Sequence, residues 1–383
     1  MADKLRVLAV GPTPPPYHGV ATFLRDLLAY APRERVEWLH LDTSDRRDAS
    51  NLGRWDLVNL RLGFTHLAEL AGRCLRGDVD LVYLPLSQNV PACLRDALFI
   101  LQSRLLCRRV VVHLHGGYFR TLYDHDAGPL FRAFARFALR RAAAVVVLGQ
   151  EFRAIFAGLV PEDRIHVVEN GVPESGAWPL RTPQPVTGKL LFMSTLTQTK
   201  GILELLRAVG QLRAAWPSVH LNVAGQWPDE TARSEALALI EREKLAGQVS
   251  FVGNVEGVAK AAFLAGGDIF CLPTRYPYEG QPLVILEAME AGLPVLSTAH
   301  GAIPSTVQDG VTGRLLPKDL TAEALAKALD EMLRDETKLR AYGEAGRRRY
   351  LERYTLAACH QRLLAVLEQA MPRKTVDVQP PNG

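Results

Sequence analysis

Short runs of apolar residues recur along the chain, and each is followed by a longer segment with helical periodicity. The runs are LRVLAVG, DLVYLPL, RRVVVHLHG, AAVVVLG and RIHVVENG in the first half, then KLLFMST, VHLNVAG, DIFCLP and LPVLSTA in the second. Because these runs are continuous rather than alternating, they predict strands buried on both faces, as in parallel sheets covered by helices. The pattern therefore predicts an α/β protein built from two doubly wound units.

The stretch ENGVPESGAWPLRTPQPVTGK has no periodicity and is rich in proline and glycine, which is typical of a linker between two such units. A final helical pattern begins at Thr355, a residue suited to cap a helix N-terminus. We therefore expect an N-terminal domain at residues 1–175, a linker at 176–188 and a C-terminal domain at 189–354. A last helix at 355–371 is expected to pack back toward the N-terminal domain, and residues 372–383 are expected to form a disordered tail.

Composition narrows the class of protein. Of 383 residues, 48% are hydrophobic and 22% are charged, which is a typical balance for a folded globular chain. The net charge of +4 is small against 45 basic residues, so we expect no nucleic-acid partner. Five scattered cysteines without a C-x-x-C pair, no signal peptide and no long uncharged apolar segment predict a reduced, cytoplasmic protein.

The segment EGQPLVILEAMEAGLP follows the predicted strand DIFCLP and carries two acids, Glu279 and Glu287. Pro282 suits the first turn of a helix, and Gly292 with the proline two residues later suits its end. The residues around this helix N-terminus are Gly280, Gln281, Pro282 and Leu283. All of them except Pro282 have a backbone N–H group, and free N–H groups at a helix N-terminus favour binding of a phosphate group. The acids are separated by about 12 Å at 1.5 Å per residue, roughly the span from a sugar across a diphosphate to a ribose.

A plainer interpretation of the two acids stays open from these residues alone. Glu279 then is a first-turn acid favoured by the helix dipole, and Glu287 is a solvated helix residue. Against it, Glu287 lies within an apolar run, where an unpaired carboxylate would be costly to bury.

The pattern E-G-x-P-L-V-x-L-E-A-M resembles the motif of the family 4 glycosyltransferases, which are retaining enzymes of the GT-B fold. The resemblance implies two Rossmann-like domains facing a central cleft and a nucleotide-sugar donor held mostly by the C-terminal domain. It also implies that Glu279 contacts the transferred sugar and Glu287 the ribose, with no metal and no other cofactor.

The segment LLFMSTLTQTKGILELL places Lys200 and a glycine after a strand and before a helix. It resembles the family motif in which an arginine and a lysine face the donor diphosphate, although Thr195 takes the arginine position here. Arg275 is a candidate to replace that charge, and the loop TRYPYEG is two residues longer than the family's S-R-Y-E-G through Pro277 and Tyr278. The plain alternative for Lys200 is a solvated surface charge.

Two N-terminal segments complete the predicted site. In VVVHLHGGYF the resemblance places His115 beside the donor sugar, while His113 is the better candidate for a core histidine. Two histidines without a third ligand do not favour zinc. In the first loop, Gly19 matches one glycine of the family's turn near a phosphate, and His18 takes the place of the other.

Other motifs have structural interpretations. The triplet Asp124-His125-Asp126 has no strand before it, so we interpret it as a helix N-cap region rather than a metal-binding D-x-D. Asn170-Gly171 is interpreted as a turn.

The segment GPLFRAFARFALRRAAA predicts a helix over residues 130–141 with Leu130, Phe131, Phe134, Phe137 and Ala138 on one face and Arg132, Arg136 and Arg140 on another. Such a helix either packs its apolar face on the sheet or lies on an anionic membrane.

The resemblance implies transfer of a sugar from a nucleotide-sugar donor to a hydroxyl of a glycan or lipid-linked glycan, in cell-surface polysaccharide synthesis, at the cytoplasm or the inner face of the membrane. The catalytic candidates are His115, Lys200 and Glu279. A sugar-nucleotide epimerase or hydrolase of the same fold and a non-enzymatic nucleotide-sugar-binding protein are the alternatives. No G-x-G-x-x-G follows a strand, which disfavours an NAD-dependent oxidoreductase.

Overall fold

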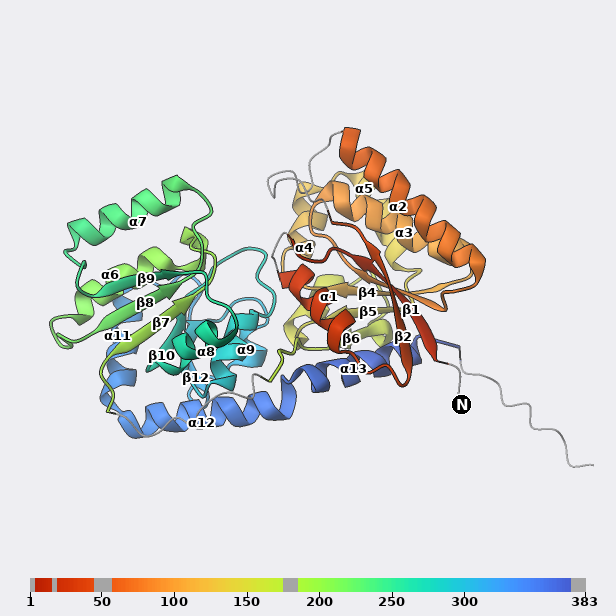
Figure 1. Cartoon of the computed structure of the whole chain (residues 1–383). Helices are drawn as coiled ribbons and strands as arrows, with labels where there is room; N and C mark the ends of the chain where they lie inside the picture. Colours follow the sequence, from red (N-terminus) through yellow and green to blue (C-terminus); the bar gives the residue numbers. More distant parts are fainter. Residues whose placement is uncertain (1–3, 16–18, 45–56, 175–184, 373–383) are drawn as a thin grey trace, which may run out of the picture.

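The structure, a computed structural model, describes residues 4–15, 19–44, 57–174 and 185–372. It contains two six-stranded sheets in separate lobes, and every neighbouring pair of strands is parallel (Figure 1). The predicted α/β class with two doubly wound units is therefore confirmed. The domain boundaries predicted at residues 175 and 188 fall between the two sheets. His18, most of the linker and nearly all of the tail predicted at 372–383 lie outside the described residues.

The first sheet has the strand order β2-β1-β3-β4-β5-β6. Its strands are β1 (Leu5–Gly11), β2 (Val36–Asp42), β3 (Leu81–Pro85), β4 (Arg109–Leu114), β5 (Ala144–Val147) and β6 (Ile165–Val167). The helices of this half are α1 (Gly19–Tyr30), α2 (Leu57–Arg76), α3 (Val90–Leu105), α4 (Phe119–Thr121) and α5 (Pro129–Leu139), and short helical turns occur at Leu122–Asp126, Gln150–Phe156 and Glu162–Arg164.

The second sheet has the order β12-β11-β10-β7-β8-β9. Its strands are β7 (Lys189–Met193), β8 (His220–Ala224), β9 (Val249–Gly253), β10 (Ile269–Leu272), β11 (Val295–Thr298) and β12 (Gly313–Leu316). The remaining helices are α6 (Ile202–Leu212), α7 (Glu230–Arg242), α8 (Gly257–Ala265), α9 (Leu283–Glu290), α10 (Ile303–Thr306), α11 (Ala322–Arg334), α12 (Glu336–Arg353) and α13 (Leu356–Gln369), with a short 3₁₀ turn at Gln198–Lys200.

The inner strands β1, β3, β4 and β5 of the first sheet bury both of their faces over nearly all of their length, as their continuous apolar sequences require. In β1, Leu8 and Val10 belong to the core on one face, while Val7 and Ala9 belong to the core on the other. The first core also contains buried residues of α3 and α5. The second contains α1 and, from the far end of the chain, Cys359, Leu363, Val366 and Leu367 of α13.

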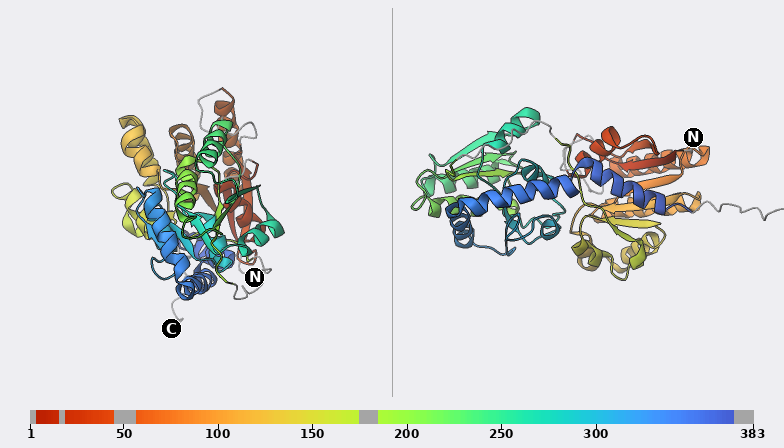
Figure 2. Two further views of the ribbon diagram at one scale, coloured as in Figure 1. Left: turned by 90° about the vertical axis from the view of Figure 1, so that its left-hand side faces the viewer. Right: turned by 90° about the horizontal axis from the view of Figure 1, so that it is seen from below.

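The helices α12 and α13 follow one another beneath both lobes, which is clearest when the molecule is seen from below (Figures 1 and 2). The chain passes between the halves twice. The first crossing includes residues 168–174 after β6, and the second lies beside it at the junction of α12 and α13. The N–H of Val172 donates to the Tyr354 carbonyl at 3.0 Å, and the N–H of Leu356 donates to the Val172 carbonyl at 3.0 Å. The carboxylate of Glu169 pairs with Arg353 and Arg362 in the same region. The two crossings are therefore bonded to each other at Val172 and Glu169.

The structure changes two local expectations from the sequence. Asn170-Gly171 is not a turn but part of the first crossing. The triplet Asp124-His125-Asp126 does not cap a helix N-terminus, because it lies in the helical turn that ends at Asp126, and α5 begins later with Gly128 as its N-cap. Arg120 pairs with Asp124 at 2.6 Å.

The predicted division of the 130–141 helix into an apolar and a basic face is wrong in part. Phe131 and Phe134 are partly buried against the first core, as expected. Leu130 and Phe137, however, are 86% and 49% exposed, on the solvent side together with Arg136 and Arg140. Arg132 is partly buried and donates to the Ala127 carbonyl at 2.9 Å.

Helix α12 closely approaches the turn after α9, and a substitution at this contact tests the packing of the second half. A Cβ added at Gly343 would lie 2.2 Å from the Gly292 carbonyl oxygen, so we expect Gly343→Ala to lower the free energy of unfolding. Overpacking of this kind costs about 1–3 kcal/mol. Urea unfolding monitored by circular dichroism measures it.

The matched control for that variant is Gly63→Ala in α2, where an added Cβ would meet no described atom within 4 Å. Alanine should stabilise that helix by roughly 0.5–1 kcal/mol. Equal unfolding free energies for Gly343→Ala and the wild type would show that α12 does not approach the turn this closely.

Candidate functional site

The second sheet reverses its strand order between β7 and β10, and the predicted site residues follow these two strands. In open parallel sheets, ligands bind at such a switch point, outside the carboxyl ends of the strands. Lys200 ends the short turn that follows β7, and Glu279 lies in the loop between β10 and α9. The topology therefore brings together two residues that are 79 positions apart.

The loops after β7 and β10 are held against each other by their backbones. The N–H of Arg275 donates to the Thr199 carbonyl at 2.7 Å. Gly201 has a φ of 85°, and a Cβ there would lie 2.2 Å from the Pro273 carbonyl oxygen, so only glycine suits this position. This contact fixes Lys200, the residue just before Gly201, above the neighbouring strand.

Lys200 and Glu279 form an ion pair at the centre of the site. Lys200 Nζ lies 2.7 Å from Glu279 Oε2, and their side chains are only 16% and 7% exposed. The hydroxyl of the fully buried Thr274 donates to the same oxygen at 2.7 Å. Lys200 Nζ also lies 4.6 Å from the centre of the Tyr276 ring. The acid predicted to meet the sugar and the base predicted to meet the diphosphate thus face one point.

The helix after Glu279 begins one residue later than expected. Pro282 is the N-cap of α9 rather than its first turn, and Leu283 is the first helical residue. Among the described residues, no side chain caps this end of α9. Its first N–H groups, at Leu283 and Val284, are therefore suited to an anionic ligand.

Glu287, in the second turn of α9, pairs with Lys260 of α8. Lys260 Nζ lies 2.6 Å from Glu287 Oε1, and the side chains are 33% and 17% exposed. Burial raises the pKa of the Glu287 carboxyl above its usual value, and the charge and hydrogen bond of Lys260 oppose that rise. Glu287 is therefore not the solvated helix residue of the plain interpretation.

From the first half, His115 reaches the same region through its backbone. A Cβ at Gly280 would lie 2.1 Å from the His115 carbonyl oxygen, so the two halves touch here. The His115 ring packs against Phe23 and His113, with ring centres 4.5 and 3.9 Å away. His113 is fully buried, its Nδ1 lies 2.6 Å from the Tyr83 hydroxyl, and burial lowers its pKa, as suits a core histidine.

The side chain of Gln281 binds other residues of the protein, and the donor contact predicted at this position stays a prediction. Its Oε1 accepts from the Asn170 N–H at 2.6 Å, and its Nε2 donates to Thr306 Oγ1 at 2.9 Å. The Asn170 amide in turn donates to the Gln281 carbonyl at 3.2 Å. Gln281 thus joins the first crossing between the halves to the start of α9.

Other predicted residues are exposed to solvent or are engaged elsewhere. Thr195 is exposed in the loop after β7. Arg275, the candidate for the missing positive charge, is bound to Glu204 of α6 at 2.8 Å. Gly19 begins α1, and an added Cβ there would meet no described atom within 4 Å. The close backbone approach predicted for Gly19 is thus not required by the described part of the chain.

Sequence reasoning missed Thr274 and Lys260. Thr274 follows the end of β10 as Glu279 does, so the rule that selected Glu279 would have found it. Lys260 had no comparable signal, because it lies on a separate helix 27 residues before its partner.

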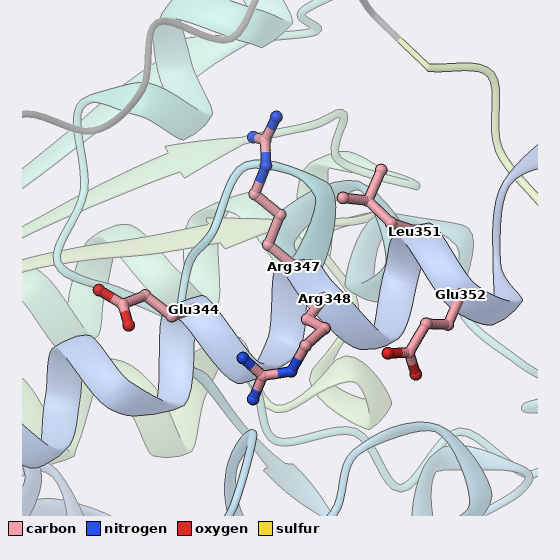
Figure 3. A pocket seen from close by; sticks show the side chains of 5 residues that line it. All are labelled: Glu344, Arg347, Arg348, Leu351 and Glu352. Atoms are coloured by element: carbon pink, nitrogen blue, oxygen red, sulfur yellow. The ribbon is translucent and has the colours of Figure 1, made fainter.

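A shallow depression on α12 lies apart from this region (Figure 3). It is lined by Glu344, Arg347, Arg348, Leu351 and Glu352, all from one helix. Arg347 donates to the Glu290 carbonyl at 2.9 Å. The depression contains none of the predicted site residues.

Two family models match, and together they span most of the chain. Residues 184–349 match the model for glycosyl transferases group 1, and residues 17–175 match the model for Glycosyltransferase Family 4.

Relatives of known activity align with part or most of the chain. Over 186 residues the chain is 31% identical to a phosphatidyl-myo-inositol mannosyltransferase from Mycobacterium leprae, and this alignment covers 48% of this chain and 47% of that protein. Over 287 residues it is 29% identical to a GDP-mannose-dependent alpha-(1-6)-phosphatidylinositol monomannoside mannosyltransferase from Mycolicibacterium smegmatis, covering 70% and 72%. The chain spans about half the length of the relatives with 30 to 31% identity.

The whole chain has a counterpart among solved structures. HepE from Anabaena, solved in complex with UDP, superposes with a TM-score of 0.73 at 19% identity and covers 95% of this chain and 100% of its own. The match confirms the predicted GT-B fold.

The buried Glu287 carboxyl should make stability depend on pH. Because its pKa is raised in the folded chain, its contribution is fully present below the unfolded pKa of about 4.3 and is lost as pH rises through the folded value. We expect the unfolding free energy of the wild type, relative to Glu287→Gln, to fall as the pH rises above the unfolded pKa of about 4.3. Urea titrations at several pH values measure this difference.

A second variant sharpens that test. Lys260→Met removes the positive charge that opposes the rise in the pKa of Glu287. The unfolding free energy of Lys260→Met, relative to that of the Lys260→Met/Glu287→Gln double variant, should therefore depend on pH more steeply. A difference that does not change with pH would contradict the assignment.

Proposed function

Because this chain belongs to glycosyltransferase family 4, we propose that it transfers a sugar, with retention of configuration and without a metal, from a nucleotide-sugar donor to a hydroxyl of a glycan or lipid-linked glycan. The observation that carries the proposal is the buried pair of Lys200 and Glu279 at the switch point of the second sheet. A base and an acid held 2.7 Å apart beside a helix N-terminus suit a ligand that combines a diphosphate with a hydroxyl-rich ring.

The ion pair suggests how the donor is received. A diphosphate oxygen replaces Glu279 as the partner of Lys200, and the N–H groups at the start of α9 add to its stabilisation. Glu279 Oε2, which accepts from both Lys200 and Thr274, then becomes available to the sugar hydroxyls. Lys200 remains placed to stabilise the charge that develops on the departing diphosphate.

Retention needs no dedicated general base in this scheme. The acceptor hydroxyl attacks from the side on which the diphosphate leaves, and the leaving phosphate oxygen takes the proton. The role proposed for His115 is to line the sugar site from the opposite half, because its backbone meets Gly280, the residue after Glu279.

The relatives suggest which donors and acceptors to test. HepE was solved with UDP, and the M. smegmatis relative is named for GDP-mannose and a phosphatidylinositol monomannoside. We propose a nucleoside diphosphate hexose as donor and a role in cell-surface polysaccharide synthesis on the cytoplasmic side of the membrane. A thermal-shift screen of uridine, guanosine and adenosine diphosphate sugars identifies the base, since bound donor stabilises the fold.

Substitutions at the ion pair test the chemistry. Lys200→Ala and Glu279→Ala should each lower kcat by about 100-fold or more, because each removes charge from the reacting centre. His113→Ala should have a smaller effect per folded molecule, because His113 is a core residue bonded to Tyr83. Transfer and donor hydrolysis are measured with the donor found in the screen, and circular dichroism gives the folded fraction.

Lys327→Ala is the matched control, because its side chain is 80% exposed on α11. Normal activity in Glu279→Ala would overturn the site assignment. Formation of an epimer or of free sugar as the main product, with no transfer to any acceptor, would favour the epimerase or hydrolase. Donor binding without any turnover would favour the binding protein.

We also propose that α5 brings the protein to anionic membranes, where a lipid-linked acceptor resides. Its solvent side combines Leu130 and Phe137 with Arg136 and Arg140, and the Arg141 guanidinium lies 3.4 Å from the centre of the Phe137 ring. Apolar and basic side chains together suit the interface of an anionic bilayer. None of the described helices is both long enough and apolar enough to span a bilayer.

Liposome sedimentation tests this surface. The double variant Leu130→Ser/Phe137→Ser should lower partitioning onto phosphatidylglycerol-rich vesicles by about tenfold or more, because the two apolar side chains no longer enter the interface. Leu237→Ser, at a 42% exposed leucine of α7 in the other half, is the control. Equal sedimentation of both variants and the wild type would contradict the proposal.

A further inference from the structure

Three tyrosine rings lead away from the ion pair and cross from one half of the protein to the other. Lys200 Nζ lies 4.6 Å from the centre of the Tyr276 ring. The Tyr276 and Tyr278 rings are 5.5 Å apart, and the Tyr278 ring is 4.3 Å from Tyr118 with an angle of 35° between them. Tyr276 and Tyr278 belong to the loop after β10, whereas Tyr118 precedes α4 in the first half. We call these three residues the tyrosine row.

The first-half end of the row is held in place by hydrogen bonds. The N–H of Tyr118 donates to Gln88 Oε1 at 2.7 Å, and its hydroxyl donates to Asp126 Oδ2 at 2.8 Å. The buried Phe119, which follows Tyr118, stacks on Phe156 with ring centres 5.3 Å apart. Asp126, one of the two acids of the D-x-D-like triplet, therefore orients a tyrosine.

The other end is held by the backbone. The Tyr276 carbonyl accepts from the Glu279 N–H at 2.9 Å and lies 2.7 Å from His300 Nε2. A Cβ added at Gly116 would lie 2.7 Å from the Tyr278 carbonyl oxygen, so the two loops meet at Tyr278. The positions of the three rings are thus set before any ligand binds.

The row is partly accessible to solvent, although Tyr118 also packs against the first core. Tyr278 is 40% exposed, Tyr118 is partly exposed, and Asp126 is exposed. Tyr278 is also one of the two residues by which the loop TRYPYEG exceeds the family's S-R-Y-E-G form. Tyr278 packs on Tyr118 and Tyr276 and still keeps an exposed part of its ring near the ion pair, where a ligand can contact it.

The chemistry of the row fits a pyranose ring. Such a ring has apolar C–H faces and a rim of hydroxyl groups, and a tyrosine ring beside an exposed carboxylate complements both. The row starts at the Lys200–Glu279 pair, where the transferred sugar is proposed to lie. It then leads into the first half, whereas Glu287 and Lys260 lie within the second.

We propose that the tyrosine row, with Asp126, is the subsite that binds a pyranose ring of the acceptor and presents its hydroxyl to the donor. This proposal rests on the proposed function and specifies its acceptor side. Tyr278 supplies the main stacking surface, Tyr118 extends it into the first half, and Asp126 accepts hydrogen bonds from the sugar hydroxyls.

Sugar and nucleotide binding are measured separately to test the subsite. Methyl α-D-mannopyranoside and methyl α-D-glucopyranoside serve as probes in saturation-transfer NMR, with and without saturating UDP or GDP, and calorimetry gives the nucleotide Kd. Tyr278→Ala should weaken binding of the preferred pyranoside about fivefold to tenfold and leave the nucleotide Kd unchanged. Tyr278→Phe should keep wild-type binding, since the ring remains.

Further variants separate the hydroxyl contacts from folding. Asp126→Asn should weaken pyranoside binding less than Tyr278→Ala, because it keeps an acceptor oxygen for Tyr118 but loses the charge. Tyr30→Ala, at a 64% exposed tyrosine of α1, is the matched control and should behave as the wild type.

Wild-type pyranoside binding in Tyr278→Ala, or no pyranoside binding by the wild type, would overturn the subsite. An equal loss of nucleotide affinity in Tyr278→Ala would also overturn it, because the ring would then belong to the nucleotide site. Failure of the wild type to bind UDP, GDP or any donor would overturn the proposed function instead, and the pyranoside measurement without nucleotide would still decide the subsite.

Discussion

The site depends on one steric constraint, namely that loops from two separate sheets must touch backbone to backbone. A Cβ at Gly280 would lie 2.1 Å from the His115 carbonyl oxygen, and Cβ atoms at Gly116 and Gly117 would lie 2.7 and 2.9 Å from the carbonyl oxygens of Tyr278 and Glu279. Glycine at these positions therefore sets the distance between the halves. The tyrosine row and the contact of Gln281 with the first crossing both depend on that distance, because each joins residues of the two halves.

The fold could be predicted because parallel strands that are buried on both faces have a simple sequence pattern. Continuous apolar runs such as DIFCLP predicted both sheets, and the rule that ligands bind at the carboxyl ends of strands placed Glu279 and Lys200 in one region. The same reasoning did not predict that these two residues bind each other. Their contact arises from the pairing of β7 with β10, and the sequence of neither loop contains that information.

Helix faces and side-chain partners were harder to predict for a different reason. In α5, Leu130 and Phe137 have the spacing of core residues, yet the helix packs with Ala135, Ala138 and Leu139 inward. Periodicity gives the apolar stripe only approximately when small residues can form the contact. The partners of the Gln281 side chain could not be predicted, because one of them, Asn170, lies in a segment without periodic structure.

The position of α13 has a consequence for how the chain acquires its structure during synthesis. Cys359, Leu363, Val366 and Leu367 complete the core that covers one face of the first sheet, although they follow the whole second sheet in the sequence. Val7 and Ala9, near the start of the chain, belong to that same core. Domains generally fold in the order in which they are synthesised. Here the first half cannot finish folding until the second half has left the ribosome, so the N-terminal half is the later of the two to become complete.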